Sequence, residues 1–364
     1  MTAPVTSREQ GLSFPRPALV GSSKPGDIGT YDRLVSTSEQ GSIFAHSWWL
    51  DAVAPNSYQI FELRRGTNLV AAWPVVFQVS DGVRHVVMPP LTQKLGIVFA
   101  PAEGKCVEVQ SRRQKATDEL IEQLGPFETF NQNFHERYTD WLPFHWRGFC
   151  QTTRYTYVLD DLSDTEALWS AMRSHHRQVI RRAEKVGVTV TDDVGIDALI
   201  DLNRKTFERQ GKPPLAGDAT IERIDAACLN NGGRKIFAGI DSSGRIHAAV
   251  YVAWVDGTAY YLMGGSEPAL RESGAQFLAL WHAIQFCGGV ASRFDFEGSM
   301  LPQVESVFRG FGGKQCPYFT ISKSPSRPGT LKGHLKEAIR FRVGRARRRI
   351  ASFAYPVVGA AGKG

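Results

Sequence analysis

The sequence lacks a pattern of paired cysteines. Its 364 residues contain five, an odd number, at Cys106, Cys150, Cys228, Cys287 and Cys316, and no two are separated by only two residues. This argues against a disulfide framework and a zinc knuckle and indicates a reducing compartment. The adjacent His175 and His176 would point in different directions on a helix, so they cannot form a metal-binding pair and no metal is expected.

Long apolar runs are also missing. No stretch approaches the roughly 20 apolar residues that span a bilayer as a helix. The first 25 residues are rich in Pro, Ser and Gly and lack the basic start and apolar centre of a signal peptide. We therefore expect a cytoplasmic chain. Hydrophobic residues at 42% and charged residues at 22% are ordinary for a globular protein, and the length suits more than one domain.

Positive charge is unevenly distributed. The net charge is +7, and residues 331–350 contain eight Lys and Arg against Glu337 alone, which leaves residues 1–330 nearly neutral. Apolar residues recur there at steps of three and four, which predicts an amphipathic helix over 331–353. This helix could dock on the rest of the chain with its basic face exposed, lie on an anionic membrane surface, or bind RNA.

The most informative stretch runs from Ile246 to Gly313. Two β-rich runs, 248–255 and 258–263, flank Asp256-Gly257, a strong signal for a two-residue hairpin. A helix follows, with Ser273 placed as its N-cap. In the next short strand, Phe294 and Phe296 should point one way and Asp295 and Glu297 the other. A further helix is expected from about residue 301.

This stretch resembles the C-terminal half of FemAB-like acyltransferases, which belong to the GCN5-related N-acetyltransferase (GNAT) superfamily. The resemblance depends on four segments in the family's order and spacing: YYLMGGS at 260–266, LRESGA at 270–275, FDFEGS at 294–299 and FRGFGG at 308–313. Two earlier segments, FAHSWWLDA at 44–52 and MPPLTQKLG at 88–96, resemble the family's first half.

The resemblance implies an α/β fold of two tandem acetyltransferase-like domains with mixed, largely antiparallel sheets, followed by the basic C-terminal helix. The expected boundaries are a flexible leader at 1–42, an N-terminal domain at 43–152, a catalytic domain at 153–326 and the basic tail at 327–364. Within the catalytic domain, the pattern predicts a strand at 153–159 and one helix over 165–185.

Acyl transfer to an amine needs a group that takes the amine proton, because an alkyl amine titrates near 10 and is otherwise protonated at neutral pH. A strand-end carboxylate partly buried by aromatic neighbours suits this task, and Glu297 is the first candidate and Asp295 the second. The alternative is that one of them only caps the following helix, where Ser299 is also placed to do so.

The family resemblance also implies a donor site. In this superfamily a Gln/Arg-x-x-Gly-x-Gly/Ala turn opens the helix that holds the pyrophosphate of coenzyme A, and Arg271, Ser273, Gly274 and Ala275 correspond to it in part. A helix N-terminus favours an anion. Family members that use aminoacyl-tRNA tend to have Phe-Lys-x-Gly-Phe in the last motif, and here Phe308 occupies the lysine position with Arg309 next to it.

The acceptor is expected between the hairpin, Glu297 and the loop after residue 210. Its candidate contacts are Tyr261, Arg209, Lys212, Ser299 and Arg309. For Arg209 and Lys212, the alternative is a Gly-Pro turn that only ends a helix.

The sequence thus predicts an N-acyltransferase that moves an acyl group from acetyl-CoA or a longer acyl-CoA to an amine of a cell-envelope or secondary-metabolite precursor. It would work in the cytoplasm, in part at the inner membrane face. One alternative is aminoacyl transfer from aminoacyl-tRNA to a peptidoglycan-type precursor. Another is a non-catalytic scaffold attached to the membrane through residues 331–353.

Overall fold

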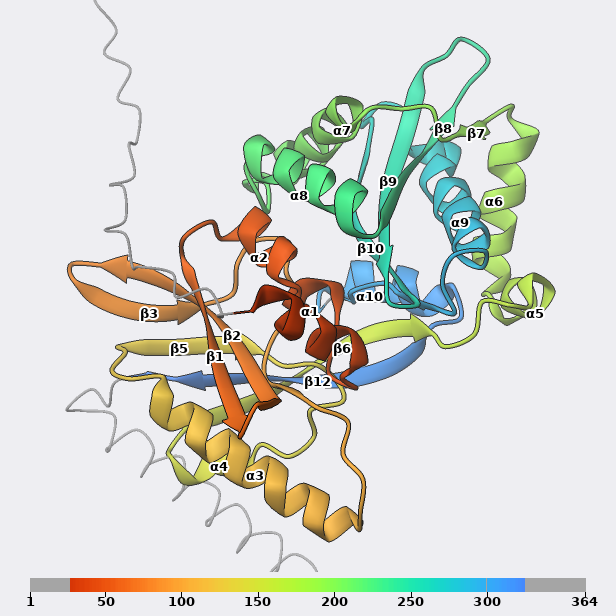
Figure 1. The fold of residues 1–364 in the computed structure, drawn as a ribbon. Coiled ribbons are helices and arrows are strands. Elements are labelled where there is room, and N and C mark those ends of the chain that lie inside the picture. The colour runs from red at the N-terminus through yellow and green to blue at the C-terminus, as the bar shows by residue number, and fades with distance from the viewer. Residues whose placement is uncertain (1–26, 299, 325–364) are drawn as a thin grey trace, which may run out of the picture. The chain divides into compact units, whose positions relative to one another are not determined.

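The computed structural model describes residues 27–298 and 300–324 (Figure 1). The N-terminal half consists of α1 (Ile28–Thr37), α2 (Ser47–Val53), β1 (Tyr58–Arg65), β2 (Asn68–Ser80), β3 (Val83–Val87), β4 (Val98–Phe99), α3 (Cys106–Gln123), β5 (Thr129–Asn133), α4 (Leu142–Trp146) and β6 (Cys150–Leu159). The C-terminal half consists of α5 (Thr165–Ala171), α6 (Ser174–Lys185), β7 (Thr189–Thr191), α7 (Ile196–Arg209), α8 (Asp218–Asn231), β8 (Gly233–Ile240), β9 (Ile246–Val255), β10 (Thr258–Ser266), α9 (Ala275–Cys287), β11 (Arg293–Asp295), α10 (Pro302–Gly310) and β12 (Lys314–Lys323).

The two halves repeat one order of elements. Two helices are followed by three consecutive antiparallel strands, then a helix, a strand parallel to the third, a short helix and a final strand. The strand pairs in the described residues are antiparallel except for β3 with β5 and β10 with β11. The predicted mixed α/β fold with largely antiparallel pairing is confirmed.

The two halves exchange their last strands. The sheet runs β1-β2-β3-β5-β12-β6-β11-β10-β9-β8-β7, with β4 paired to β2. The final strand of the C-terminal half, β12, therefore pairs with β5 of the N-terminal half, and β6 pairs with β11. Sequence analysis expected two separate sheets. The structure joins them into one, and the expected boundary at 152/153 falls inside β6.

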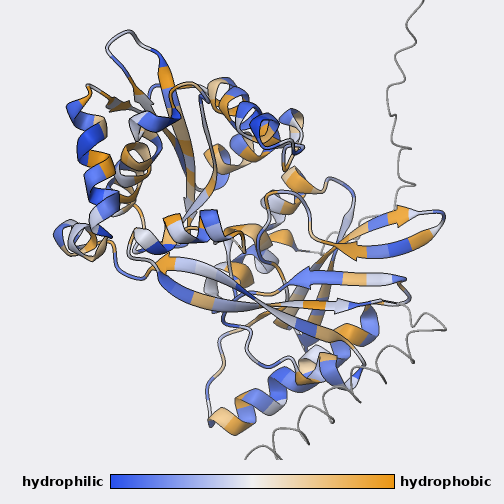
Figure 2. Cartoon of the chain, turned by 180° about the vertical axis from the view of Figure 1, so that it is seen from behind, coloured by the Kyte–Doolittle hydropathy of each residue, from blue (hydrophilic) through white to orange (hydrophobic). Residues whose placement is uncertain are grey.

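Helices cover both faces of the C-terminal strands. In Figure 1, α7 and α8 lie on one side of β9 and β10, and α6 and α9 lie on the other. Phe44 and Trp49 of the N-terminal half share a core with Tyr260 of β10, and the rings of Phe44 and Tyr260 are 5.3 Å apart. Helix α3 covers the N-terminal strands and is made largely of hydrophilic residues (Figure 2), with Ala116, Thr117 and Leu120 buried.

The predicted hairpin is confirmed: Asp256 and Gly257 have φ of 48° and 76°, both positive as a type I′ turn requires. Three details differ from the sequence predictions. Residues 28–37 of the expected leader form α1, which buries Tyr31, Leu34 and Val35. The helix at 165–185 breaks into α5 and α6, because Met172 is extended and buried. The N-cap of α9 is Gly274 instead of Ser273.

Candidate active site

The site lies where two parallel strands separate. Strands β10 and β11 pair over only three positions, the last being Tyr260 with Asp295, while β10 continues to Ser266. The pairing of β10 with β9 also shifts between Tyr261 and Met263. Beyond Tyr260, the edge of β10 that faces β11 therefore has no pairing partner among the described strands. Such an edge leaves backbone N–H and C=O groups available to a ligand.

Glu297 lies at this opening, two residues after β11 ends. Its φ of 60° is in the left-handed region, which non-glycine residues seldom adopt and which concentrates at functional sites. Its Oε1 is buried and has no hydrogen-bond partner among the described residues. Burial and the nearby Asp295 carboxylate raise the pKa of Glu297 well above its ordinary value, and the Lys94 ammonium opposes this only in part.

Gly298 explains how this turn is held. It has a φ of 57°, and a Cβ there would lie 2.3 Å from the Tyr155 carbonyl oxygen on β6. Only glycine allows β6 to approach so closely. The turn that follows β11 is therefore pressed against β6. As a result the Glu297 side chain starts from a backbone that is fixed on both sides.

Asp295 has a different position. It is fully buried, and its Oδ2 accepts a hydrogen bond from Lys94 Nζ at 2.6 Å. Its Oδ1 accepts from Thr156 Oγ1 at 2.5 Å and from the Glu297 backbone N–H at 2.8 Å. Both oxygens are occupied by protein donors. Because Asp295 is fully buried and both oxygens are engaged, it is poorly placed to take a substrate proton, and its bond to the Glu297 N–H holds that backbone in place.

Lys94 belongs to a buried charge network that joins the two halves. Its ammonium also donates to Glu136 Oε2 at 2.9 Å, and Arg293 pairs with Glu136 Oε1 at 2.7 Å. Burial alone would lower the pKa of Lys94, but Asp295 and Glu136 raise it above its ordinary value. Lys94 and Arg293 hold the pKa of Glu136 well below its usual range. Two basic side chains, Lys94 and Arg293, thus face two acidic ones, Asp295 and Glu136, and such pairing is what buried charges require.

The other wall of the opening is aromatic. Tyr261 is half-buried, and its ring contacts Phe308 at 5.7 Å between centroids. Phe308 in turn stacks on Phe296 at 5.3 Å. Burial raises the pKa of Tyr261 to about 12, so the phenol stays protonated and can donate a hydrogen bond. Phe308 is thus a buried ring at the position where the resemblance implies a lysine for members that use aminoacyl-tRNA.

Arg309 does not replace that lysine. Its guanidinium pairs with Glu305 on the same helix at 2.7 Å, and its side chain is 48% exposed. Helix α10 begins at Pro302 with Leu301 as N-cap. Among the described residues, Asp295 bonds to Lys94, Thr156 and the Glu297 N–H instead of the first turn of α10, and no bond from Glu297 to that turn is present. Ser299 lies outside the described residues.

The predicted donor residues lie at the N-terminus of α9. Arg271 is 49% exposed there, beside Glu272. A Cβ on Gly274 would meet Val179 of α6 at 2.8 Å, and Ala275 is buried against Gly239 of β8. Ser273 Oγ accepts from the Ala275 N–H at 3.3 Å. Close helix packing therefore accounts for the small residues at 274 and 275, and their anion-binding role stays a prediction.

Arg209 and Lys212 lie at the exposed end of α7. This helix runs along the second half of β10, where Asn203 Nδ2 donates to the Gly264 carbonyl at 2.9 Å and Thr206 bonds with Ser266. The end of α7 therefore lies beyond the end of β10. No contact between these two side chains and Glu297 is present in the described part of the chain.

Sequence reasoning missed Lys94 and Glu136. Lys94 stands inside the segment 88–96 that resembles the family's first half, but an isolated lysine in a loop is expected at the surface. Its burial depends on a partner 201 residues away. Across residues 27–298 and 300–324 no group of His, Cys, Asp and Glu is arranged to hold a metal ion, and no helix is long and apolar enough to cross a membrane.

The geometry agrees with comparisons to known proteins. The family model described as an acetyltransferase (GNAT) domain matches residues 170–300. Residues 170–300 thus form a GNAT-type acetyltransferase domain, and the chain is an acyltransferase. A search of curated proteins found no match.

Solved structures are similar in fold over 80–90% of this chain. FemX is similar with a TM-score of 0.62 at 12% identity, over 80% of this chain and 95% of FemX. L-PGS from Bacillus licheniformis has a TM-score of 0.50 at 12% identity, over 90% of this chain and 98% of that one. A protein of unknown function from Bacteroides thetaiotaomicron has a TM-score of 0.50 at 10% identity, over 81% and 97%. At these identities the likeness shows the fold alone.

Proposed function

We propose that the chain is an N-acyltransferase that transfers an acyl group from an acyl-CoA thioester to an amine of a cell-envelope or secondary-metabolite precursor. The observation that carries this proposal is Glu297, whose buried, unpartnered Oε1 lies at the separation of β10 and β11. A carboxylate with a raised pKa is a stronger base than an ordinary one, as proton removal from an ammonium group requires.

In the reaction, the amine nitrogen attacks the thioester carbonyl carbon. A C–N bond forms, the C–S bond breaks and its electron pair goes to sulfur, which takes up a proton as it leaves. Glu297 accepts the proton that the amine loses, directly or through a water. Unpaired backbone N–H groups of β10 beyond Tyr260 are the candidates to stabilise the developing oxyanion.

Asp295 acts through Glu297 in this proposal. Its hydrogen bond to the Glu297 N–H keeps the turn in its left-handed conformation, while Lys94 and Thr156 keep Asp295 in place. Asp295 is thus a positioning residue, which revises the earlier view of it as a second candidate base. Tyr261 borders the same opening and is placed to donate a hydrogen bond to substrate.

The charged residues suggest where each substrate enters. Arg271 is exposed at the start of α9 and suits the phosphates of the donor. Arg209 and Lys212 lie beyond the end of β10, so they suit an acceptor that has anionic groups. Arg309 is already paired with Glu305, which makes it the weakest candidate of the set. We place the reaction in the cytoplasm, where acyl-CoA is present.

The same site could instead take aminoacyl-tRNA, which is favoured by the likeness to FemX. Phe308 argues against it, because this buried ring stacks on Phe296 where tRNA-dependent relatives have a lysine. A donor assay separates the two. The full chain is incubated with an amine panel and with acetyl-CoA, longer acyl-CoAs or aminoacyl-tRNA, and released thiol and amide mass are measured.

We expect thiol release that requires both acyl-CoA and amine and that Glu297→Gln suppresses. Glu222→Gln, which changes an exposed carboxylate on α8, is the matched control and should retain full activity. If amide forms only from aminoacyl-tRNA, the donor is aminoacyl-tRNA and the acyl-CoA proposal is wrong. If none of the donors gives a product, the proposal is refuted.

A further inference from the structure

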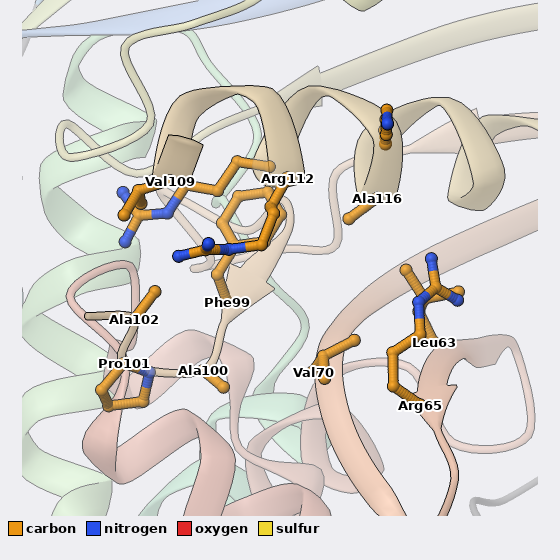
Figure 3. Close-up of a pocket in the computed structure, with 12 residues that line it drawn as sticks. Leu63, Arg65, Val70, Phe99, Ala100, Pro101, Ala102, Val109, Arg112 and Ala116 are labelled. Carbon is orange, nitrogen blue, oxygen red and sulfur yellow. The ribbon is translucent and has the colours of Figure 1, made fainter. Parts of the chain in front are cut away.

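The structure contains a second concave site, on the N-terminal half and away from Glu297. A cavity of about 420 Å³ lies between helix α3 and strands β1, β2 and β4. In Figure 3, Val109, Arg112 and Ala116 descend from α3, Leu63, Arg65 and Val70 rise from the strands, and Ala100, Pro101 and Ala102 close one end. This volume is within the range of small-molecule sites.

The lining has two kinds of residue. Eight of the twelve lining residues are apolar, and the other four are the cations Arg65, Arg112, Arg113 and Lys115. None is acidic, and none has a hydroxyl or amide side chain. The cavity thus offers apolar surface and positive charge, but no side-chain groups of the kind that pair with sugar hydroxyls or base edges.

The cations are not fully used by the protein. Arg113 pairs with Glu39 at 3.3 Å, but its Nε is buried and lacks a hydrogen-bond partner within the described residues. No described residue pairs with Lys115, whereas Arg65 pairs with Glu119 and Arg112 donates to the Glu103 carbonyl. A buried N–H donor without a partner costs free energy that an anionic ligand would recover.

From this we infer that the cavity binds an anionic amphiphile, a molecule with one carboxylate or phosphate group on an aliphatic body. The anionic group contacts Arg113 Nε, the exposed Lys115 adds positive charge elsewhere along the lining, and the aliphatic body lies along Phe99, Val70 and the wall formed by 100–102. Arg113 also lies 5.4 Å over the Phe99 ring, which holds the guanidinium at the boundary between the apolar and charged parts.

Calorimetric titration of the full chain with decanoate and with decyl phosphate tests this, with 1-decanol, acetate and inorganic phosphate as controls. We expect saturable binding of at least one of the two amphiphiles and much weaker binding of the three controls. A preference between decanoate and decyl phosphate identifies the anionic group. Decanol binding as tightly as decanoate and decyl phosphate would overturn the role of charge.

Two variants locate the ligand. The double substitution Arg113→Gln and Lys115→Gln should weaken binding at least about tenfold, since hydrogen bonds to charged groups are worth that much. Ala102→Phe keeps the charges and fills the cavity, and it should abolish binding. Arg64→Gln is the matched control, because Arg64 neighbours Arg65 on β1 but pairs with Glu62, outside the cavity lining.

The amphiphile site does not depend on the proposed reaction, since none of its residues touches Glu297. Binding that survives both the double variant and Ala102→Phe would place the ligand elsewhere and refute the inference. No binding of either amphiphile would refute it too, whatever the outcome of the acyl-transfer assay.

Discussion

The two halves of the molecule each contain a parallel strand pair that separates, but only one of the openings stays free. In the C-terminal half, β10 and β11 part after Tyr260 and the space between them is bordered by Tyr261 and Glu297. In the N-terminal half, β3 and β5 pair over only two positions, the last being Val86 with Phe130. There the chain folds back into its own opening.

The returning segment, around Gln93 and Leu95, fills the N-terminal opening and takes the place of β3 beside the end of β5. The Leu95 N–H donates to the Asn133 carbonyl at 2.8 Å, and Asn133 Nδ2 donates to the Gln93 carbonyl at 2.8 Å. Leu95 also bridges to Phe134 in parallel. The side chain of the neighbouring Lys94 extends to the other opening, where its ammonium donates a hydrogen bond to Asp295. Of the two repeated openings, one therefore stays free, and the segment that fills the other supplies the Lys94 that supports it.

The largest effect should come from the open side. Replacing Glu297 by Gln keeps the side-chain size but removes the base, so turnover should fall about 10²–10⁴-fold. The melting temperature should not fall, because no described partner of Oε1 is lost. Rate and melting temperature are measured on the same preparation, with Glu222→Gln beside it. A variant that loses stability but keeps its rate would contradict the catalytic role.

Substitution of the buried Lys94 should lower the free energy of unfolding. Lys94→Met leaves Asp295 and Glu136 without their shared cation, and removing one partner of a buried pair costs about 3–5 kcal/mol. Urea unfolding measures it. Lys185→Met, on an exposed lysine of α6, should change the free energy of unfolding by less than about 0.5 kcal/mol. Equal small effects of the two substitutions would show that Lys94 is not structurally important.

The carboxyl groups of Glu297 and Glu136 should give opposite dependences of folding stability on pH. The pKa of Glu297 is raised in the fold, so its contribution to stability is present below the ordinary value of 4.5 and is lost as pH rises. The pKa of Glu136 is lowered, so its contribution is present above 4.5 and is lost as pH falls. Glu297→Gln should therefore gain stability relative to wild type as pH rises, and Glu136→Gln should lose it. Unfolding curves from pH 4 to 8 check the signs, and parallel curves would remove the contrast.

The smallest effect is expected at Arg309. Its pair with Glu305 is largely solvent-exposed, and such pairs contribute under about 1 kcal/mol. Arg309→Gln should therefore leave turnover and KM within about twofold of wild type. Tyr261→Phe provides the comparison, because it removes a hydroxyl at the opening itself and should raise KM more. If Arg309→Gln raises KM strongly and Tyr261→Phe does not, Arg309 binds the acceptor after all.

Local patterns predicted the secondary structure around the candidate site well. The hairpin followed from Asp256-Gly257, and the alternation after it placed Phe294 and Phe296 in the core opposite Asp295. These features depend on neighbours a few residues apart, where strand and turn periods decide the outcome. The burial of Lys94 and the left-handed turn at Glu297 could not be predicted this way. Both depend on contacts between residues of opposite halves or on the close approach of β6.

The expected domain boundary at 152/153 lies inside β6 for a related reason. The alternating pattern at 153–159 indicates a strand, but no local signal shows which strand β6 or β12 will pair with. Edge strands of similar composition are interchangeable until the tertiary arrangement selects a partner. Helix α1 was missed because its apolar residues, Tyr31, Leu34 and Val35, are few and follow a Pro/Gly-rich segment.

The exchange of β6 and β12 also has a consequence for how the chain is made. The Thr320 hydroxyl bonds to Asn133 across 187 residues, and β12 covers the edges of both β5 and β6. At about 5–20 residues per second, the ribosome needs roughly 10–40 s to produce the strand that β5 awaits. During that time the emerging N-terminal half has open sheet edges, which other chains can pair with. The sheet of the N-terminal half can be completed only after nearly the whole C-terminal half has been translated, so the two halves must complete their folding together.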